Sequence, residues 1–70
     1  MNNYKLTNTI KVERAKRNLT QEELAEQIGV TRKTINTIEN GKFIPSTVLA
    51  IKLARYFNIQ VEELFELTEQ

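Results

Sequence analysis

Apolar residues recur at helical spacing along most of the chain, and short polar segments separate one set from the next. The first helix is expected to begin after Thr7 or Asn8, either of which can cap it, and to run to about Arg17. Further helices are expected at about residues 20–28, 31–40, 46–57 and 61–65. Five short helices in a chain of 70 residues predict an all-α fold.

The two ends of the chain carry weaker signals of extended structure. Residues 4–7 alternate apolar and polar side chains, which is typical of a half-buried strand. A small terminal β-ribbon that pairs residues 4–6 with residues 66–68 is compatible with this pattern. Neither a linker nor a repeat interrupts the sequence, so residues 1–70 are expected to form a single compact five-helix domain.

Residues 20–40 contain two helices joined by a tight turn. Thr20, with Glu23 three residues later, predicts a capping box at the start of the first of these helices. Gly29 ends that helix at the position where a positive φ is usual, and Thr31 caps the next one. A connection of three to four residues that contains glycine is typical of a helix-turn-helix.

The second of these helices is unusually polar for its length. Ile35 and Ile38 are expected to point inward. Four polar residues project from the rest of the helix: Arg32, Lys33, Asn36 and Thr37. Donors and acceptors on the outer face of a helix held at a fixed angle are what a protein needs to read base edges in the DNA major groove.

Five sequence segments resemble the lambda-repressor-like (Cro and XRE) helix-turn-helix family. They are Leu19-Thr-Gln-Glu-Glu-Leu-Ala, Ile28-Gly-Val-Thr-Arg-Lys-Thr-Ile, Ile38-Glu-Asn-Gly-Lys, Pro45-Ser and Leu53-Ala-Arg-Tyr-Phe. The resemblance covers roughly residues 8–65. It implies a lambda-repressor-like DNA-binding domain in which helix 31–40 enters the major groove of double-stranded DNA.

The family's base-reading positions are matched by Arg32, Lys33 and Thr37. Both basic side chains suit guanine O6 and N7, and Arg32 can bind them bidentately. Lys33 has a phosphate contact as its alternative. Asn36 lies between these residues and can pair with adenine, or it can face the DNA backbone or solvent.

The resemblance also implies contacts to DNA phosphates. Gln21 matches a glutamine that bonds a phosphate in the family, helped by the helix N-terminus. Asn40 and Lys42 fall where the family grips phosphate, although Asn40 with Gly41 is also typical of a helix end. Thr31 and Thr34 provide hydroxyls that serve as caps or as additional phosphate contacts.

Arg14 and Glu39 match a pair of residues that form an ion pair in the family and thereby orient the reading helix. Residue 13 departs from the usual pattern, since Glu13 stands where an apolar residue is common and Val12 beside it is apolar. Either the first helix is slightly rotated, or Glu13 pairs with a basic neighbour.

The helix over residues 46–57 is apolar around most of its circumference. From Val48 to Phe57 only two residues are charged. A helix that lies on a core needs an apolar stripe of only about 100°. We therefore expect a homodimer whose interface includes Val48, Ile51, Arg55 and Leu67. The alternative is a monomer in which Ile44, Val48 and Ile51 cover the core from different sides.

Composition excludes several other functions. The chain has no Cys and no His, which removes thiolate metal sites, disulfides and the usual general base. We expect no metal, no cofactor and no enzymatic activity. No run of about 18 apolar residues is present, so we expect no membrane partner and a cytoplasmic, nucleoid-associated protein of a prokaryote.

Charge is unevenly distributed along the chain. The net charge is +1, but residues 1–42 carry +3 and residues 43–70 carry −2. This asymmetry suits a protein that presents one end to phosphates. The leading hypothesis is a sequence-specific transcriptional regulator, namely a repressor that binds a palindromic operator as a homodimer. The alternative is a protein-interaction module or antitoxin-type partner-binding protein on the same fold.

Overall fold

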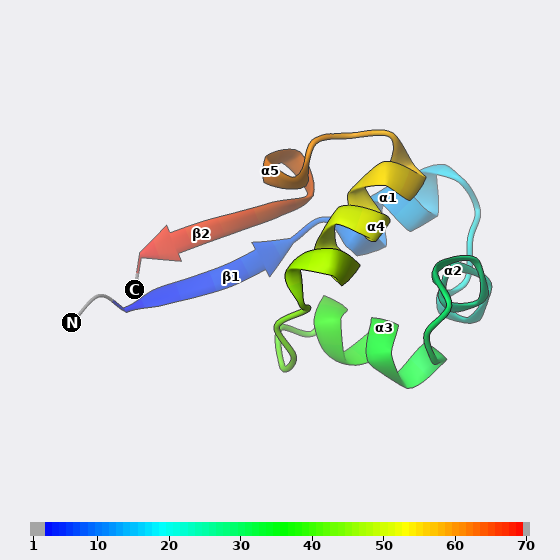
Figure 1. The fold of residues 1–70 in the computed structure, drawn as a ribbon, viewed down its shortest axis with the longest axis horizontal. Coiled ribbons are helices and arrows are strands. Elements are labelled where there is room, and N and C mark those ends of the chain that lie inside the picture. Colours follow the sequence, from blue (N-terminus) through cyan, green and yellow to red (C-terminus); the bar gives the residue numbers. More distant parts are fainter. Residues whose placement is uncertain (1–2, 70) are drawn as a thin grey trace.

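A computed structural model, which describes residues 3–69, contains five helices and a two-stranded antiparallel sheet (Figure 1). The elements are β1 (Tyr4–Asn8), α1 (Ile10–Lys16), α2 (Gln21–Ile28), α3 (Arg32–Glu39), α4 (Thr47–Phe57), α5 (Val61–Leu64) and β2 (Phe65–Glu69). This mostly helical architecture confirms the predicted fold. None of the helices within residues 3–69 is long and apolar enough to cross a membrane.

The terminal ribbon is real and longer than the sequence suggested. Leu6 lies opposite Leu67, and the pairing continues to Asn8 opposite Phe65. α5 therefore ends at Leu64, one residue earlier than expected, because Phe65 already has an extended backbone. The ribbon projects away from the helices, so that its outer half stands clear of them (Figure 1).

Hydroxyl side chains begin three of the helices, as the sequence predicted. The Thr20 hydroxyl accepts a hydrogen bond from the Glu23 amide, and the Glu23 carboxylate accepts one from the Thr20 amide. Thr31 and Ser46 accept bonds from the third residue of α3 and of α4 in the same way. Each cap contributes about 1 kcal/mol to its helix and fixes where the helix starts.

The start of α1 differs from the expectation. Asn8 belongs to β1, and the helix begins at Ile10 rather than directly after Thr7 or Asn8. Asn8 still serves the helix, because its side-chain Oδ1 accepts a hydrogen bond from the Ile10 amide at 3.1 Å.

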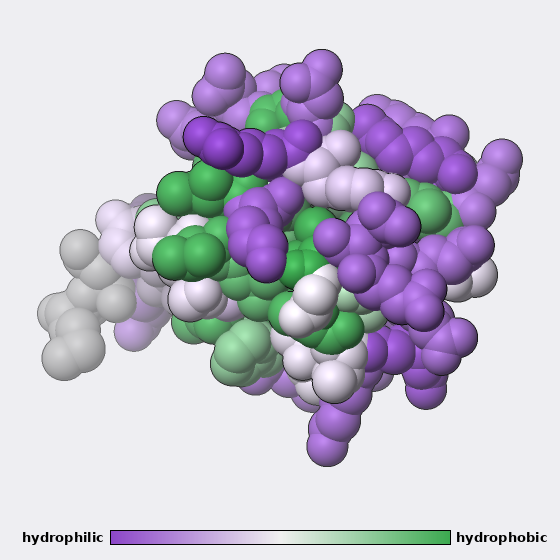
Figure 2. Space-filling model, turned by 45° about the vertical axis from the view of Figure 1, so that its right-hand side comes forward, coloured by the Kyte–Doolittle hydropathy of each residue, from purple (hydrophilic) through white to green (hydrophobic). Residues whose placement is uncertain are grey.

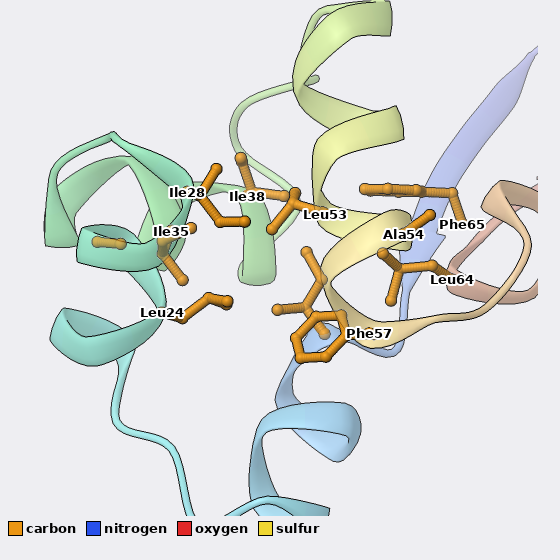
Figure 3. Close-up of a cluster of buried hydrophobic side chains, with 11 residues drawn as sticks. Leu24, Ile28, Ile35, Ile38, Leu53, Ala54, Phe57, Leu64 and Phe65 are labelled. Atoms are coloured by element: carbon orange, nitrogen blue, oxygen red, sulfur yellow. The ribbon is translucent and has the colours of Figure 1, made fainter.

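The core forms where one stripe of each helix meets the others (Figure 3). α1 contributes Ile10, α2 contributes Leu24, Ala25 and Ile28, α3 contributes Ile35 and Ile38, and α4, α5 and β2 complete the cluster with Leu53, Ala54, Phe57, Leu64 and Phe65. All of these side chains are buried. Because α2 and α3 share this core, the outer face of α3 is held at a fixed angle to the rest of the domain.

Glu13 is accommodated through its basic neighbours. Its side chain is buried and accepts hydrogen bonds from Arg17 at 2.9 Å and from Lys16 at 3.3 Å. The hydrogen bond from Arg17 lowers the pKa of the Glu13 carboxyl. Arg17 also donates to the Phe57 carbonyl and lies over the Phe57 ring, so the charged pair links α1 to the end of α4. Val12 is exposed instead.

Candidate nucleic-acid interface

The turn between α2 and α3 has helix-turn-helix geometry. Gly29 adopts φ = 89°, in the left-handed region that a residue with a Cβ enters only at a cost. The amides of Gly29 and Val30 both donate to the Ala25 carbonyl, at 2.8 and 3.0 Å. α2 thus ends and α3 begins within three residues, with Thr31 as the cap of α3.

α3 has two chemically distinct sides. Ile35 and Ile38 are at most 1% exposed and face the core. The predicted reading residues lie together on the other side, where Arg32, Lys33 and Asn36 are exposed and Thr37 is half-buried. Their spacing of i, i+1, i+4 and i+5 places them along one outward stripe of the helix.

Arg14 and Glu39 join α1 to the end of α3. The Arg14 Nε donates to Glu39 Oε2 at 2.6 Å, and Nη2 donates to Oε1 at 3.1 Å. A third nitrogen, Nη1, donates to the Leu19 carbonyl at 2.8 Å. Both side chains are largely buried, and the hydrogen bond to Glu39 raises the pKa of Arg14. A bidentate pair of this kind restricts the angle between the two helices.

Gln21 connects the start of α2 to α3. Its Nε2 donates to Asn36 Oδ1 and to Glu39 Oε1, each at 3.1 Å. The Asn36 side chain is therefore fixed by the hydrogen bond that its Oδ1 accepts from Gln21. Its amide nitrogen still has hydrogens to donate to a ligand. The sequence placed Gln21 at phosphate and Asn36 at a base, but gave no sign that the two side chains bond each other.

Asn8 is a positioning residue that sequence reasoning missed. Its Nδ2 donates to the Ile38 carbonyl at 3.0 Å, near the C-terminus of α3, while its Oδ1 accepts from the Ile10 amide. One side chain thus connects the ribbon and α1 to α3. Its candidacy as a helix cap was the only signal of this role in the sequence.

The threonine hydroxyls of α3 are turned toward their own helix. Thr31 Oγ1 accepts from the Thr34 amide, and the Thr31 and Thr34 hydroxyls lie 3.0 Å apart. The Thr37 hydroxyl lies 3.0 Å from each of two carbonyls, those of Lys33 and Thr34, to which it can donate. The methyl group of Thr37 is consequently the part best able to meet a ligand.

The loop after α3 continues the same surface. The Asn40 amide donates to the Asn36 carbonyl, and the Lys42 amide donates to the Thr37 carbonyl at 2.9 Å. Both side chains are exposed, beside the end of α3. Phe43 follows them with 48% of its surface exposed, and it was not among the predicted site residues. Two large apolar residues directly before a proline were the signal that could have drawn attention to it.

The residues predicted for a dimer interface lie on a separate surface. Val48, Ile51 and Arg55 are exposed on one side of α4, and Ile44 before the helix is 71% exposed. The monomeric alternative required Ile44 and Val48 to cover the core, and their exposure shows that they do not. Figure 2 shows hydrophobic residues reaching the surface in patches between hydrophilic ones.

Leu67 lies on the side of the ribbon that faces α4. Directly opposite residues of an antiparallel pair point to the same face, so Leu67 shares a face with Leu6. Leu6 in turn lines a hollow together with Ile51 and Pro45. Leu67 is 64% exposed because the outer half of the ribbon extends beyond the helices.

Known proteins with similar sequences are named as helix-turn-helix transcriptional regulators. The helix-turn-helix family model matches residues 10–64. The chain is 48% identical over 60 residues to the uncharacterized HTH-type transcriptional regulator MJ0272 of Methanocaldococcus jannaschii, covering 86% of this chain and 91% of the relative. It is 40% identical over 65 residues to the uncharacterized HTH-type transcriptional regulator YgzD of Bacillus subtilis, covering 93% and 98%.

A solved structure agrees with this assignment. The restriction-modification controller protein C.AhdI of Aeromonas hydrophila superposes with a TM-score of 0.70 at 31% identity, covering 77% of this chain and 78% of that one. The family is a DNA-binding class that is not enzymatic. The chain belongs to the helix-turn-helix family of lambda-repressor-like, XRE-type transcriptional regulators.

Proposed function

We propose that this transcriptional regulator is a repressor that binds a palindromic operator as a homodimer, with α3 in the major groove. We also propose that residues 1–70 act as one DNA-binding domain. The observation that carries the proposal is the polar outer stripe of α3, whose angle is constrained by the bidentate contact between Arg14 and Glu39. A helix presented in this way matches the width and the hydrogen-bonding pattern of the major groove.

The outward residues divide by the groups that they can bind. Arg32 and Lys33 donate to guanine, Asn36 pairs with adenine and Thr37 meets a base by its methyl group. Phosphates are contacted around this stripe by Asn40 and Lys42 and by the one hydroxyl hydrogen that the pair of Thr31 and Thr34 does not use. Gln21 joins them once its amide releases Asn36 and Glu39. Contacts of the second kind fix the register on the duplex, while those of the first kind select the sequence.

The second surface supports the proposal of a homodimer. The exposed side of α4 and the inner face of the ribbon offer Val48, Ile51 and Leu67 to a partner, with Arg55 at the edge. A twofold-symmetric interface uses the same patch on both subunits, so one apolar surface is sufficient. Two reading helices about 34 Å apart then meet successive turns of the major groove on one side of the duplex.

Repression is the regulatory outcome that requires the fewest binding surfaces on so small a protein. Occupying an operator that overlaps a promoter blocks polymerase by excluded volume. Activation would require an additional favourable contact with the transcription machinery. The surfaces described above are accounted for by DNA and by a second subunit.

Selection of bound sequences from a random pool of duplex DNA tests the proposal. The expected result is an inverted repeat with half-site centres about 10 base pairs apart, bound by two chains. An enriched single half-site would contradict the homodimer. Absence of any enriched sequence would contradict sequence-specific DNA binding and would favour the protein-interaction alternative. A promoter-reporter fusion that carries the selected operator then tests the sign, because a repressor lowers reporter expression.

A further inference from the structure

A hollow of about 330 Å³ opens beside the reading stripe. It is lined by Lys33, Thr34, Thr37, Lys42 and Phe43. Three of these residues belong to α3 and two to the loop that follows it. Phe43 stands outside the set of residues that the proposed function uses, so its exposed ring needs another explanation.

The walls of the hollow are apolar because the polar atoms near them are already bonded. The Thr37 hydroxyl lies within hydrogen-bonding distance of two carbonyls of its own helix, and the Thr34 hydroxyl lies against that of Thr31. Both threonines therefore have methyl groups left to offer. The phenyl ring of Phe43, about half exposed, adds the largest apolar area.

The loop holds Phe43 in this place. The amides of Lys42 and Phe43 both donate to the Thr37 carbonyl, at 2.9 and 3.3 Å. Phe43 is thereby attached to the same turn of α3 that carries Thr37. Two ammonium groups, those of Lys33 and Lys42, belong to the side chains around the hollow, and both attract phosphate.

An apolar hollow with two ammonium groups around it fits one kind of group on a DNA duplex. Within the major groove the base edges present hydrogen-bonding groups, and the apolar exception is the 5-methyl group of thymine. We propose that the hollow receives the 5-methyl group of a thymine, with Phe43 as its outer wall. This proposal rests on the proposed DNA-binding function and makes Phe43 a specificity-determining residue within it.

The test removes the methyl group without altering any hydrogen bond. In the selected operator, each thymine is replaced in turn by uracil, and the Kd of the full-length protein is measured for each duplex. One thymine in each half-site is expected to be sensitive, with affinity falling about threefold to fourfold, which is the effect of leaving one buried methyl group unfilled. The remaining thymines provide the internal control.

Protein variants then assign the sensitive position to the hollow. Phe43→Ala is expected to remove most of the uracil effect at that position and at no other, whereas Phe43→Leu, which keeps an apolar wall, retains part of it. Thr37→Ser, which removes only the methyl group, is a second variant for the same position. Unchanged uracil sensitivity in both Phe43→Ala and Thr37→Ser would overturn the proposal.

Two further outcomes separate this proposal from its neighbours. A cytosine at the sensitive position that is bound more tightly after 5-methylation would support the proposal, because the hollow would then receive the same methyl group from a second pyrimidine. If wild-type protein binds a selected operator and no thymine in it is sensitive to uracil, the proposal that the hollow receives a methyl group is overturned. The proposed DNA-binding function would still stand. Absence of specific binding by wild-type protein would overturn both.

Discussion

α3 and α4 resemble each other in how they begin and in how they pack, and they differ in their outer faces. Each begins at a hydroxyl cap, Thr31 for α3 and Ser46 for α4, and each buries one apolar stripe in the common core. Away from the core they differ. α3 exposes charged and amide groups, whereas α4 exposes aliphatic side chains beside Arg55.

The difference indicates what each helix is suited to bind. Polar groups on the outside of α3 are hydrated when no ligand is present, so the free protein bears little cost for them. Exposed aliphatic groups on α4 gain free energy only when another apolar surface covers them. These properties support the proposal of a charged, hydrogen-bonding partner for α3 and of a second protein subunit for α4.

The largest effect is expected from breaking the pair that aims α3. Glu39→Ala leaves the guanidinium of Arg14 largely buried without its carboxylate, which should lower the free energy of unfolding by about 3–5 kcal/mol. Urea denaturation measures this loss. Glu26→Ala, at an exposed position of α2, is the matched control and should change stability little. Equal stability of the two variants would show that the ion pair does not stabilise the position of α3.

A charge on the outer face of α4 should separate the subunits. Val48→Asp places a carboxylate in the proposed interface, which should weaken dimerisation by about 2 kcal/mol, or roughly 30-fold. Sedimentation equilibrium measures the dissociation constant. Val12→Asp is the control, because Val12 is similarly exposed but lies on α1. The same dissociation constant for Val48→Asp and Val12→Asp would refute this interface.

Removal of one reading side chain from α3 should alter specificity more than folding. Arg32→Ala should weaken binding to the selected operator by about 1–3 kcal/mol and relax base choice at one position. Fluorescence anisotropy on operator and random duplexes measures both. An equal loss on random DNA would show that Arg32 contacts the backbone instead of a base.

Lys42 should act on all DNA sequences alike. Lys42→Gln is expected to lower affinity for operator and random DNA together and to flatten the dependence of log K on log salt by about one unit. Lys16→Gln removes the same charge from α1, on the side near Phe57 and away from α3, and should leave the slope unchanged. An unaltered slope for Lys42→Gln would mean that this residue does not meet phosphate.

The smallest effect concerns pH and the packing of α1. The hydrogen bond from Arg17 holds the pKa of Glu13 below its ordinary value of 4.5 in the folded protein. Glu13 therefore stabilises the fold at pH values above 4.5, and this contribution is lost as the pH falls through the lower folded-state pKa. The difference in unfolding free energy between wild type and Glu13→Gln should be largest near neutral pH and shrink below pH 4.5. In an Arg17→Met background this pH dependence should weaken without vanishing, because Lys16 still donates a hydrogen bond to the Glu13 carboxylate.

Local features of the fold were predictable because they depend on neighbouring residues. The capping box of Thr20 and Glu23, the left-handed Gly29 and the caps at Thr31 and Ser46 all involve residues a few positions apart. The strand pairing was predicted too short, because the turn from α5 into β2 depends on Phe65 packing into the core.

Contacts between distant residues were predicted only where a family motif marked them. The motif implied that Arg14 and Glu39 would meet across 25 positions, and the structure brings them together. No motif pointed to the bond from Gln21 to Asn36 or to the two bonds of Asn8. Side chains of this kind are polar and commonplace, so their partners depend on how the helices pack.

The sequence by itself determined which segments form helices and which residues of α3 remain polar, because periodicity and capping act over one or two turns. Only the tertiary structure decided that Glu13 is held by Arg17, that Ile44 and Val48 stay exposed, and that Phe43 closes a hollow beside Thr37. These outcomes depend on the angles between helices, and those angles are set by the core as a whole and not by any one segment.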